Sequence, residues 1–254
     1  MASGSCGNAG RLSLALLLAR LNFRRSGLGP LWGTVGVFFT VGAVGLLFGT
    51  ILRRQLVSFD DYVNALASGL VMWSFLSAMT CDSSIAFARW MPILRHSTIS
   101  FSVISLSLLL RHLPVLVLNT VLLFVLQLAL VGLRPAPLPM AAAMVLLVIN
   151  VSWMGVLTMV LGARFRDIGQ MVANVMQIAF LLTPILWPPY FLGRFEYLLA
   201  FNPFYYQLSI FTNSAAGAVA PAFHWVAASA MAAGGSMLAL VVYRSSRHRW
   251  PYWI

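Results

Sequence analysis

The sequence predicts an all-helical integral membrane protein with six transmembrane helices, and three observations lead to this class. Apolar residues make up 61% of the chain and charged residues only 8%, which leaves too little polar surface to cover a soluble protein. The apolar residues form runs of about 20, the length at which a helix crosses a hydrocarbon core of ~30 Å. These runs, within the bounds given next, contain no Arg, Asp or Glu.

The six spans belong to a single transmembrane domain covering residues 1–254, and the arginines predict its orientation. The spans are expected at about 31–51, 62–81, 113–133, 139–163, 168–187 and 222–243. With the N-terminus inside, 12 of the 16 arginines lie on the inner side and 4 on the outer side. Because basic residues favour the cytoplasmic side, we expect a multi-pass protein of the cytoplasmic membrane with both termini in the cytoplasm.

An N-terminal helix is expected over residues 11–25, before the first span. Its arginines suit a helix that lies on the inner membrane surface, where they reach the lipid phosphates. Arg24 and Arg25 would hold this helix at the headgroups, and Trp32 would mark the interface at which the first span begins. The chain is therefore expected to contact membrane lipids before it crosses them.

Several classes of function are disfavoured by the residues present. The chain has no lysine, so it cannot contain the phosphate-binding P-loop, which needs a lysine near its end. The net charge of +11 comes from arginines that lie between apolar runs, which indicates a membrane protein rather than a nucleic-acid-binding one. Neither a metal-ligand cluster nor a serine-nucleophile motif is present, so we expect no enzyme and no metal site. A channel remains an alternative, although no charged ring or carbonyl filter motif is seen.

Ion-coupled transport is also disfavoured, because the predicted spans carry no carboxylate to bind a coupling ion. Energy for uphill transport would then come from a partner on the cytoplasmic side. The segment 82–112 is the best candidate for that contact, although an amphipathic helix resting on lipid explains it equally well. A second inner segment, 163–168, either joins the contact or fixes two helix ends. The candidate coupling residues are Arg89, Trp90, Arg95, Arg164, Arg166 and Asp167.

The outer segment that follows the fifth span is rich in aromatic residues. Nine of the 20 residues from 187 to 206 are aromatic, against 13% in the whole chain. An aromatic belt at the interface explains this density, and so does a gate built from broken helices. Aromatic rings stack on the apolar faces of sugars, so a sliding glycan would suit such a lining. The candidate lining residues are Trp73, Phe75, Trp187, Tyr190, Phe191, Tyr205 and Tyr206.

Four motifs carry a resemblance to a known family. They are "RRSGLGPLWG" (24–33), "ARFRDIGQMVANVMQ" (163–177), "TPILWPP" (183–189) and "FNPFYYQLSIF" (201–211). Taken together, they resemble the permeases of type-two ABC exporters, and most closely the branch that exports polysaccharides. The resemblance covers about residues 11–243.

The resemblance implies a homodimer in which each copy binds a separate cytoplasmic ATPase subunit. ATP and Mg would be held by those two ATPase subunits, so that this chain needs no cofactor and is not an enzyme by itself. It implies a cytoplasmic coupling helix at about 86–97 and an extracytoplasmic gate of re-entrant helices at about 185–212. Pro184, Asn202 and Pro203 would form the turns of this gate.

The cargo implied by the resemblance is a lipid-linked polysaccharide of the O-antigen, capsule, teichoic acid or galactan type. A drug or lipid efflux permease of the same exporter type is the alternative, and a membrane scaffold that transports nothing is a more remote one. The genes next to this one would separate glycan from drug export.

Overall fold

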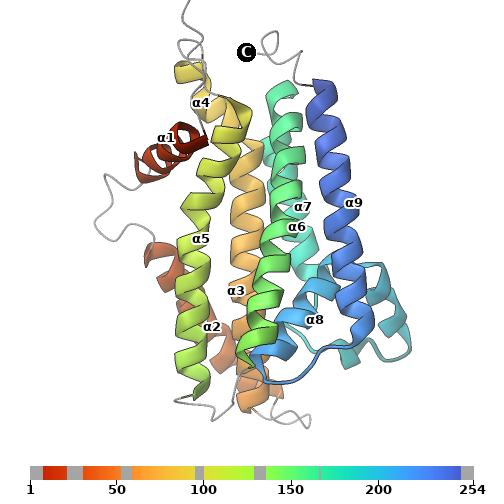
Figure 1. Cartoon of the computed structure of the whole chain (residues 1–254). Helices are drawn as coiled ribbons and strands as arrows, with labels where there is room; N and C mark the ends of the chain where they lie inside the picture. The colour runs from red at the N-terminus through yellow and green to blue at the C-terminus, as the bar shows by residue number, and fades with distance from the viewer. Residues whose placement is uncertain are drawn as a thin grey trace, which may run out of the picture.

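The computed structural model describes residues 8–21, 31–52, 59–94, 100–128, 136–165 and 167–246, and within them it contains helices and no strands. The prediction of an all-helical membrane protein is thereby confirmed. Figure 1 shows the long helices standing side by side in one bundle. The helices are α1 (Asn8–Leu21), α2 (Leu31–Leu52), α3 (Phe59–Ser84), α4 (Ala86–Leu94), α5 (Phe101–Leu126), α6 (Pro137–Arg164), α7 (Ile168–Leu182), the 3-10 helix η3 (Pro189–Phe201), α8 (Pro203–Ala215) and α9 (Ala222–Ser246).

Five helices in the described part of the chain are long and apolar enough to cross a membrane, namely α2, α3, α5, α6 and α9. The fifth predicted span, α7, has 15 residues and is therefore only about 22 Å long. It ends at Leu182, five residues before the predicted end, because Pro184 disfavours helical geometry at Thr183, which is extended (ψ 133°). The described part of the chain thus has five helices long enough to span a membrane, and α7 is a shorter apolar helix beside them.

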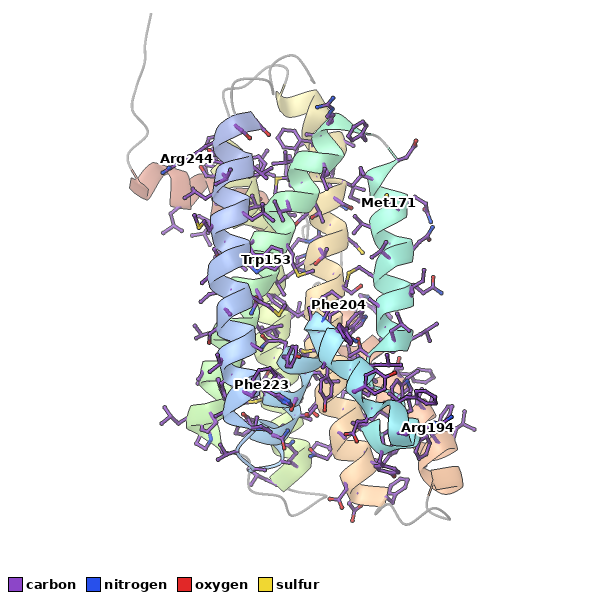
Figure 2. The ribbon with its side chains drawn as sticks, turned by 90° about the vertical axis from the view of Figure 1, so that its right-hand side faces the viewer. Trp153, Met171, Arg194, Phe204, Phe223 and Arg244 are labelled. Atoms are coloured by element: carbon purple, nitrogen blue, oxygen red, sulfur yellow. The ribbon has the colours of Figure 1, made fainter. Side chains whose placement is uncertain are left out.

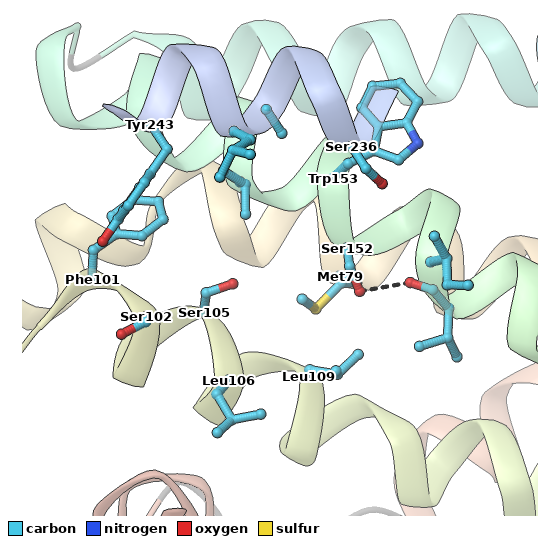
Figure 3. A pocket seen from close by; sticks show the side chains of 15 residues that line it. Met79, Phe101, Ser102, Ser105, Leu106, Leu109, Ser152, Trp153, Ser236 and Tyr243 are labelled. Carbon is cyan, nitrogen blue, oxygen red and sulfur yellow. Dashed lines mark hydrogen bonds between the residues drawn. The ribbon is translucent and has the colours of Figure 1, made fainter. Parts of the chain in front are cut away.

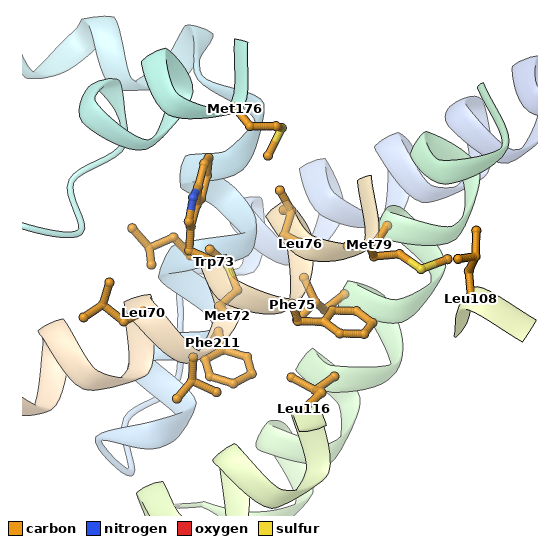
Figure 4. Close-up of a cluster of buried hydrophobic side chains, with 14 of the residues drawn as sticks. Leu70, Met72, Trp73, Phe75, Leu76, Met79, Leu108, Leu116, Met176 and Phe211 are labelled. Atoms are coloured by element: carbon orange, nitrogen blue, oxygen red, sulfur yellow. The ribbon is translucent and has the colours of Figure 1, made fainter. Parts of the chain in front are cut away.

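The helix α3 lies at the centre of the bundle and is packed on all sides. It contacts α2, α5, α6, α7 and α8, and its side chains Leu66, Met72, Leu76 and Met79 are fully buried. Figure 4 shows the last three of these side chains. The mean hydropathy of α3, 1.3, is the lowest of the five long helices, and polar side chains such as Ser68 and Thr80 are buried along it, so that protein rather than lipid surrounds it. This makes α3 the element through which the others are held together.

The second predicted span ended too early and the third began too late, and the omitted helix ends carry charges. The helix α5 begins at Phe101 instead of residue 113, and α3 continues to Ser84. The segment 82–112 is therefore mostly helical bundle and not a long cytoplasmic loop. The prediction stopped before Arg111 and Asp82 because a lone charge is costly in a membrane helix, whereas in the structure these two residues neutralise each other at 3.0 Å.

The helix α1 lies beside α5 and crosses the direction of the long helices (Figure 1). Ala15 and Leu18 are buried, while Leu12 and Leu17 are exposed, so the helix has apolar surface on two sides, as suits a helix resting at a membrane interface. Trp32, predicted as an interfacial anchor, lies in the first turn of α2 and is 62% exposed. The other two predicted anchors, Arg24 and Arg25, lie outside the described residues.

The segment between α7 and α9 forms two short helices, η3 and α8, at the end of the bundle opposite α4 (Figure 1). η3 is interrupted at Gly193, whose φ of 50° is a conformation that favours glycine. α8 is tied to the bundle by buried amides: Asn150 Nδ2 donates to Gln207 Oε1 and Gln207 Nε2 donates to the Ala143 carbonyl, both at 3.2 Å. The short helices expected before the last span are therefore present.

Candidate functional site

The first candidate site is the joint between α3 and α4, where four charged or ionisable side chains meet. The carboxylate of Asp82 receives Arg89 Nη2 at 3.1 Å, Arg111 Nη1 at 3.0 Å and His112 Nε2 at 2.9 Å. We call these residues the Asp82 cluster. Arg89 comes from α4 and the other two basic groups from α5, so one carboxylate at the end of α3 holds all three helices. None of the four side chains is more than 33% exposed.

The opposite side of the same joint is held by glycines of α6 and α7. Gly155 and Gly162 of α6 and Gly169 of α7, which we call the glycine notch, face Ser83, Ser84 and Ile85. A Cβ atom on Gly162 would overlap the carbonyl oxygen of Ser84, and one on Gly155 would lie 2.9 Å from Ser83 Oγ. Small residues allow such close approach of membrane helices, and here they allow it at the point from which α4 departs.

Sequence reasoning missed both the cluster and the notch. Gly155 and Gly162 are seven residues apart and therefore lie on one face of a helix, which is a signal present in the sequence. Asp82, in contrast, is 29 residues from Arg111, and no local pattern connects them. Only the packing of α3 on α5 brings the pair together.

The predicted coupling residues have different surroundings in the structure. The coupling helix expected at 86–97 is described as α4 over 86–94. Arg89 belongs to the Asp82 cluster, while Trp90, expected at the surface, is only 8% exposed and packs within the chain. Arg164 is exposed with its guanidinium 5.2 Å from the centre of the Phe165 ring, and Asp167 is exposed just before α7. Arg95 and Arg166 lie outside the described residues.

The second candidate site is the contact between the end of α7 and the start of α8, which we call the α7–α8 turn. Asn202 Oδ1 accepts from the backbone N–H of Phe204 at 3.0 Å and so caps α8. Its Nδ2 donates to the Leu182 carbonyl at 3.3 Å and to Thr183 Oγ1 at 3.0 Å. Pro203 occupies the first helical position, where a missing N–H costs nothing, and Pro184 is buried in the turn after α7.

The aromatic residues predicted to line a path fall into two groups. Trp73 and Phe75 are 7% and 4% exposed, and Trp73 packs against the rings of Phe180 and Phe204, with centroids 5.6 and 5.5 Å away. Phe75 is thus a core residue of this chain. Tyr190 and Phe191 of η3 are 52% and 47% exposed, as an accessible surface would require.

The remaining predicted aromatics are anchored at the same end of the bundle. Trp187 Nε1 donates to the Leu181 carbonyl at 3.2 Å. Tyr205 and Tyr206 are half-buried, and their rings lie 5.4 Å from the ring of His224. These side chains therefore support the α7–α8 turn while η3 supplies the exposed rings.

The helix α3 connects the two candidate sites. Near its start, Tyr62 Oη donates to the Leu186 carbonyl, 2.9 Å away in the turn after α7. Its middle carries Trp73, which packs on α7 and α8, and its end carries Asp82. A displacement at one site would reach the other through a single packed helix.

Replacing Asn202 with alanine is expected to loosen the α7–α8 turn. The variant loses the cap of α8, which is worth about 1 kcal/mol, together with both hydrogen bonds to α7. Faster hydrogen–deuterium exchange over residues 183–206 would show this. Asn174→Ala is the matched control, since Asn174 is exposed on α7 and accepts only from Gln170 one turn away. Equal exchange in the two variants would contradict the assignment of Asn202.

A comparison with known protein families identifies one to which the chain is similar. Residues 15–215 match the family model described as ABC-2 type transporter, a range that runs from α1 to the end of α8 and includes both candidate sites. A search of the curated proteins finds no match. Within the described residues, no group of three or more His, Cys, Asp or Glu side chains is placed to hold a metal ion.

Proposed function

The chain belongs to the ABC-2 type transporter family of membrane permeases, and we propose on this premise that it is the membrane subunit of an ATP-driven exporter of a lipid-linked polysaccharide. Permeases of this family work with a separate ATPase subunit, and their membrane domain has no nucleotide-binding site. In the proposed complex, two ATPase subunits bind ATP and Mg, and α4 receives their motion. The α4 end of the bundle and both termini then face the cytoplasm.

The observation that carries this proposal is the attachment of α4 to α3. The Asp82 cluster holds α4 from the side of α5, and the glycine notch supports the joint from the side of α6 and α7. Because both contacts are short and partly buried, a push on α4 moves α3 with it. α3 then acts on the α7–α8 turn through Tyr62 and Trp73.

The cargo class is proposed from the chemistry of the exposed rings at the far end. Tyr190, Phe191 and Phe201 of η3 are between 47% and 81% exposed. Aromatic faces bind the C–H faces of sugar rings with weak and tolerant contacts, which suits a polymer that has to slide. Charged side chains would bind each unit too firmly for such movement.

Two copies of the chain are proposed to enclose the path. A cavity of about 620 Å³ lies between α2, α3 and α7, and Trp32, Trp73 and Phe180 are among the residues that line it. The adjoining faces of α2 and α7 expose apolar side chains such as Phe39 and Ile178. A second copy placed against these faces would turn the open cavity into part of an enclosed pathway.

The size of this cavity also favours a second candidate function, the efflux of a drug or lipid by the same type of exporter. Pockets for drug-sized molecules span roughly 300–1,000 Å³, and this cavity falls within that range. Trp187→Ala separates the two functions. Under the first proposal this variant should export glycan poorly or make the pathway leaky. Under the second proposal the amount of glycan at the cell surface should be unchanged.

Co-purification from native membranes tests the proposed complex. After mild extraction, purification of the tagged chain should recover a P-loop ATPase together with an untagged copy of the chain. The recovered complex should hydrolyse ATP, and the tagged chain alone should not. The chain alone in liposomes should move no cargo against a gradient. Recovery without any P-loop ATPase, or pumping by the chain alone, would contradict the proposal.

A further inference from the structure

A groove that plays no part in the proposed path lies between α5 and α9, with α3 and α6 as its floor (Figure 3). Its volume is about 480 Å³. Most of its lining is apolar and includes Met79, Leu106, Ile149, Trp153 and Leu240. Small side chains such as Ser105, Ser236 and Ala239 line it as well and leave the space open.

The position and length of the groove match one leaflet of a bilayer. It runs along residues 101–109 of α5 and 236–243 of α9, which lie in the half of the bundle nearer α4 (Figure 1). Eight residues of helix rise roughly 12 Å, and half of a hydrocarbon core is about 15 Å thick. A single lipid chain of that leaflet therefore fits along the groove.

A positive charge stands in line with the groove at the end of α9. Ser236, Leu240 and Arg244 follow one another at four-residue intervals and so lie on one face of α9. The first two line the groove, and Arg244 is exposed in the last turn of α9. Arg244 forms no ion pair with any described residue. An apolar channel that ends at such an arginine complements a molecule with a hydrocarbon tail and a phosphate.

We propose that this groove holds one acyl chain of an anionic phospholipid and that Arg244 binds its phosphate. The site lies on a different face of the bundle from the cavity between α2, α3 and α7, so it does not depend on the proposed cargo. The bound lipid fills the space between α5, which packs on α3, and α9, which packs on α6. The rings of Phe101 and Tyr243, 5.1 Å apart, connect the two helices at one end of this space.

Native mass spectrometry of the full chain tests the tail site, after exchange into mixed micelles with equal phosphatidylglycerol and phosphatidylcholine. Ser236→Phe places a ring in the groove and should lower the retained phosphatidylglycerol at least fivefold. Ser229→Phe is the matched control, because Ser229 is exposed on the same face of α9, seven residues earlier and outside the groove. It should retain lipid like the unmodified chain. Ser105→Leu, which fills the groove from α5, should repeat the loss if Ser236→Phe fails to fold.

The headgroup contact is tested by Arg244→Gln in the same experiment. Removing one arginine near the membrane surface should lower the preference for phosphatidylglycerol over phosphatidylcholine about fivefold, while the total lipid retained stays the same. Arg194→Gln is the control, because Arg194 lies at the opposite end of the bundle (Figure 2). Four results would overturn the proposal: full retention in both groove-filling variants, no preference for phosphatidylglycerol in the unmodified chain, an unchanged preference in Arg244→Gln, or crosslinking of a Ser236→Cys variant to a second copy.

Discussion

Replacing Gly162 with alanine is expected to destabilise the protein by about 3 kcal/mol, the upper part of the range for overpacked positions, and to abolish transport. The new Cβ atom would overlap the carbonyl oxygen of Ser84. That oxygen belongs to the backbone and cannot rotate away as a side chain would. The end of α3 and the start of α4 therefore have to shift together. Thermal unfolding in detergent and an export assay would measure the two effects.

The matched control for this substitution is Gly234→Ala, also inside a long helix. A Cβ atom on Gly234 meets nothing within 4 Å. Alanine is favoured over glycine in helices by about 1 kcal/mol, so this variant should be as stable as the unmodified protein or slightly more so. If Gly162→Ala unfolded at the same temperature as Gly234→Ala, the close contact between α6 and the α3–α4 joint would not exist.

Replacing Asp82 with asparagine is expected to have the second large effect. The change keeps the shape of the side chain and removes its charge, so that Arg89 and Arg111 lose their shared counter-ion. Breaking a buried ion pair costs on the order of 3–5 kcal/mol, and we expect the lower end because the side chain of Asp82 is 20% exposed. A lower unfolding temperature would measure the loss of stability.

Two further variants complete this test, a matched control on the same helix and the removal of one partner of Asp82. Asp60→Asn, at the exposed start of the same helix, should change the stability by less than about 1 kcal/mol. Arg89→Gln leaves Arg111 and His112 on Asp82 and releases only α4. It should unfold almost normally, since partly exposed ion pairs contribute about 1 kcal/mol or less, yet ATP hydrolysis in the proposed complex should no longer drive export. Normal export by Arg89→Gln would show that the pair does not transmit motion.

Much of the fold could be predicted because hydrocarbon imposes a length and a composition on each span. The bounds of α2, α6 and α9 agree with their predicted spans to within a few residues, since apolar runs end where polar residues begin. The turn chemistry of Asn202–Pro203 was equally local: a capping side chain followed by proline starts a helix. Such signals depend only on neighbours in the chain.

The wrong predictions arose where a residue's position depends on a contact with a residue far away in the sequence. Arg111 looked like the end of a span, and the structure places it inside α5 because Asp82 of α3 neutralises it. Trp90 was expected on the surface of a short helix, yet it is buried, because residue type alone does not tell which helix face meets a neighbour. The early end of α7 followed from Pro184, a local signal that was available and was given too little weight.

By itself, the sequence determined that this chain is a bundle of membrane helices without a P-loop, because composition and run length are properties that no packing can alter. Only the tertiary structure decided that one carboxylate binds α4 to α3 and α5, and that three glycines allow close packing of α6 and α7 against this joint. It alone also decided that a groove opens between α5 and α9. These features depend on which helix faces meet, and that choice is made by the packing of segments far apart in the chain.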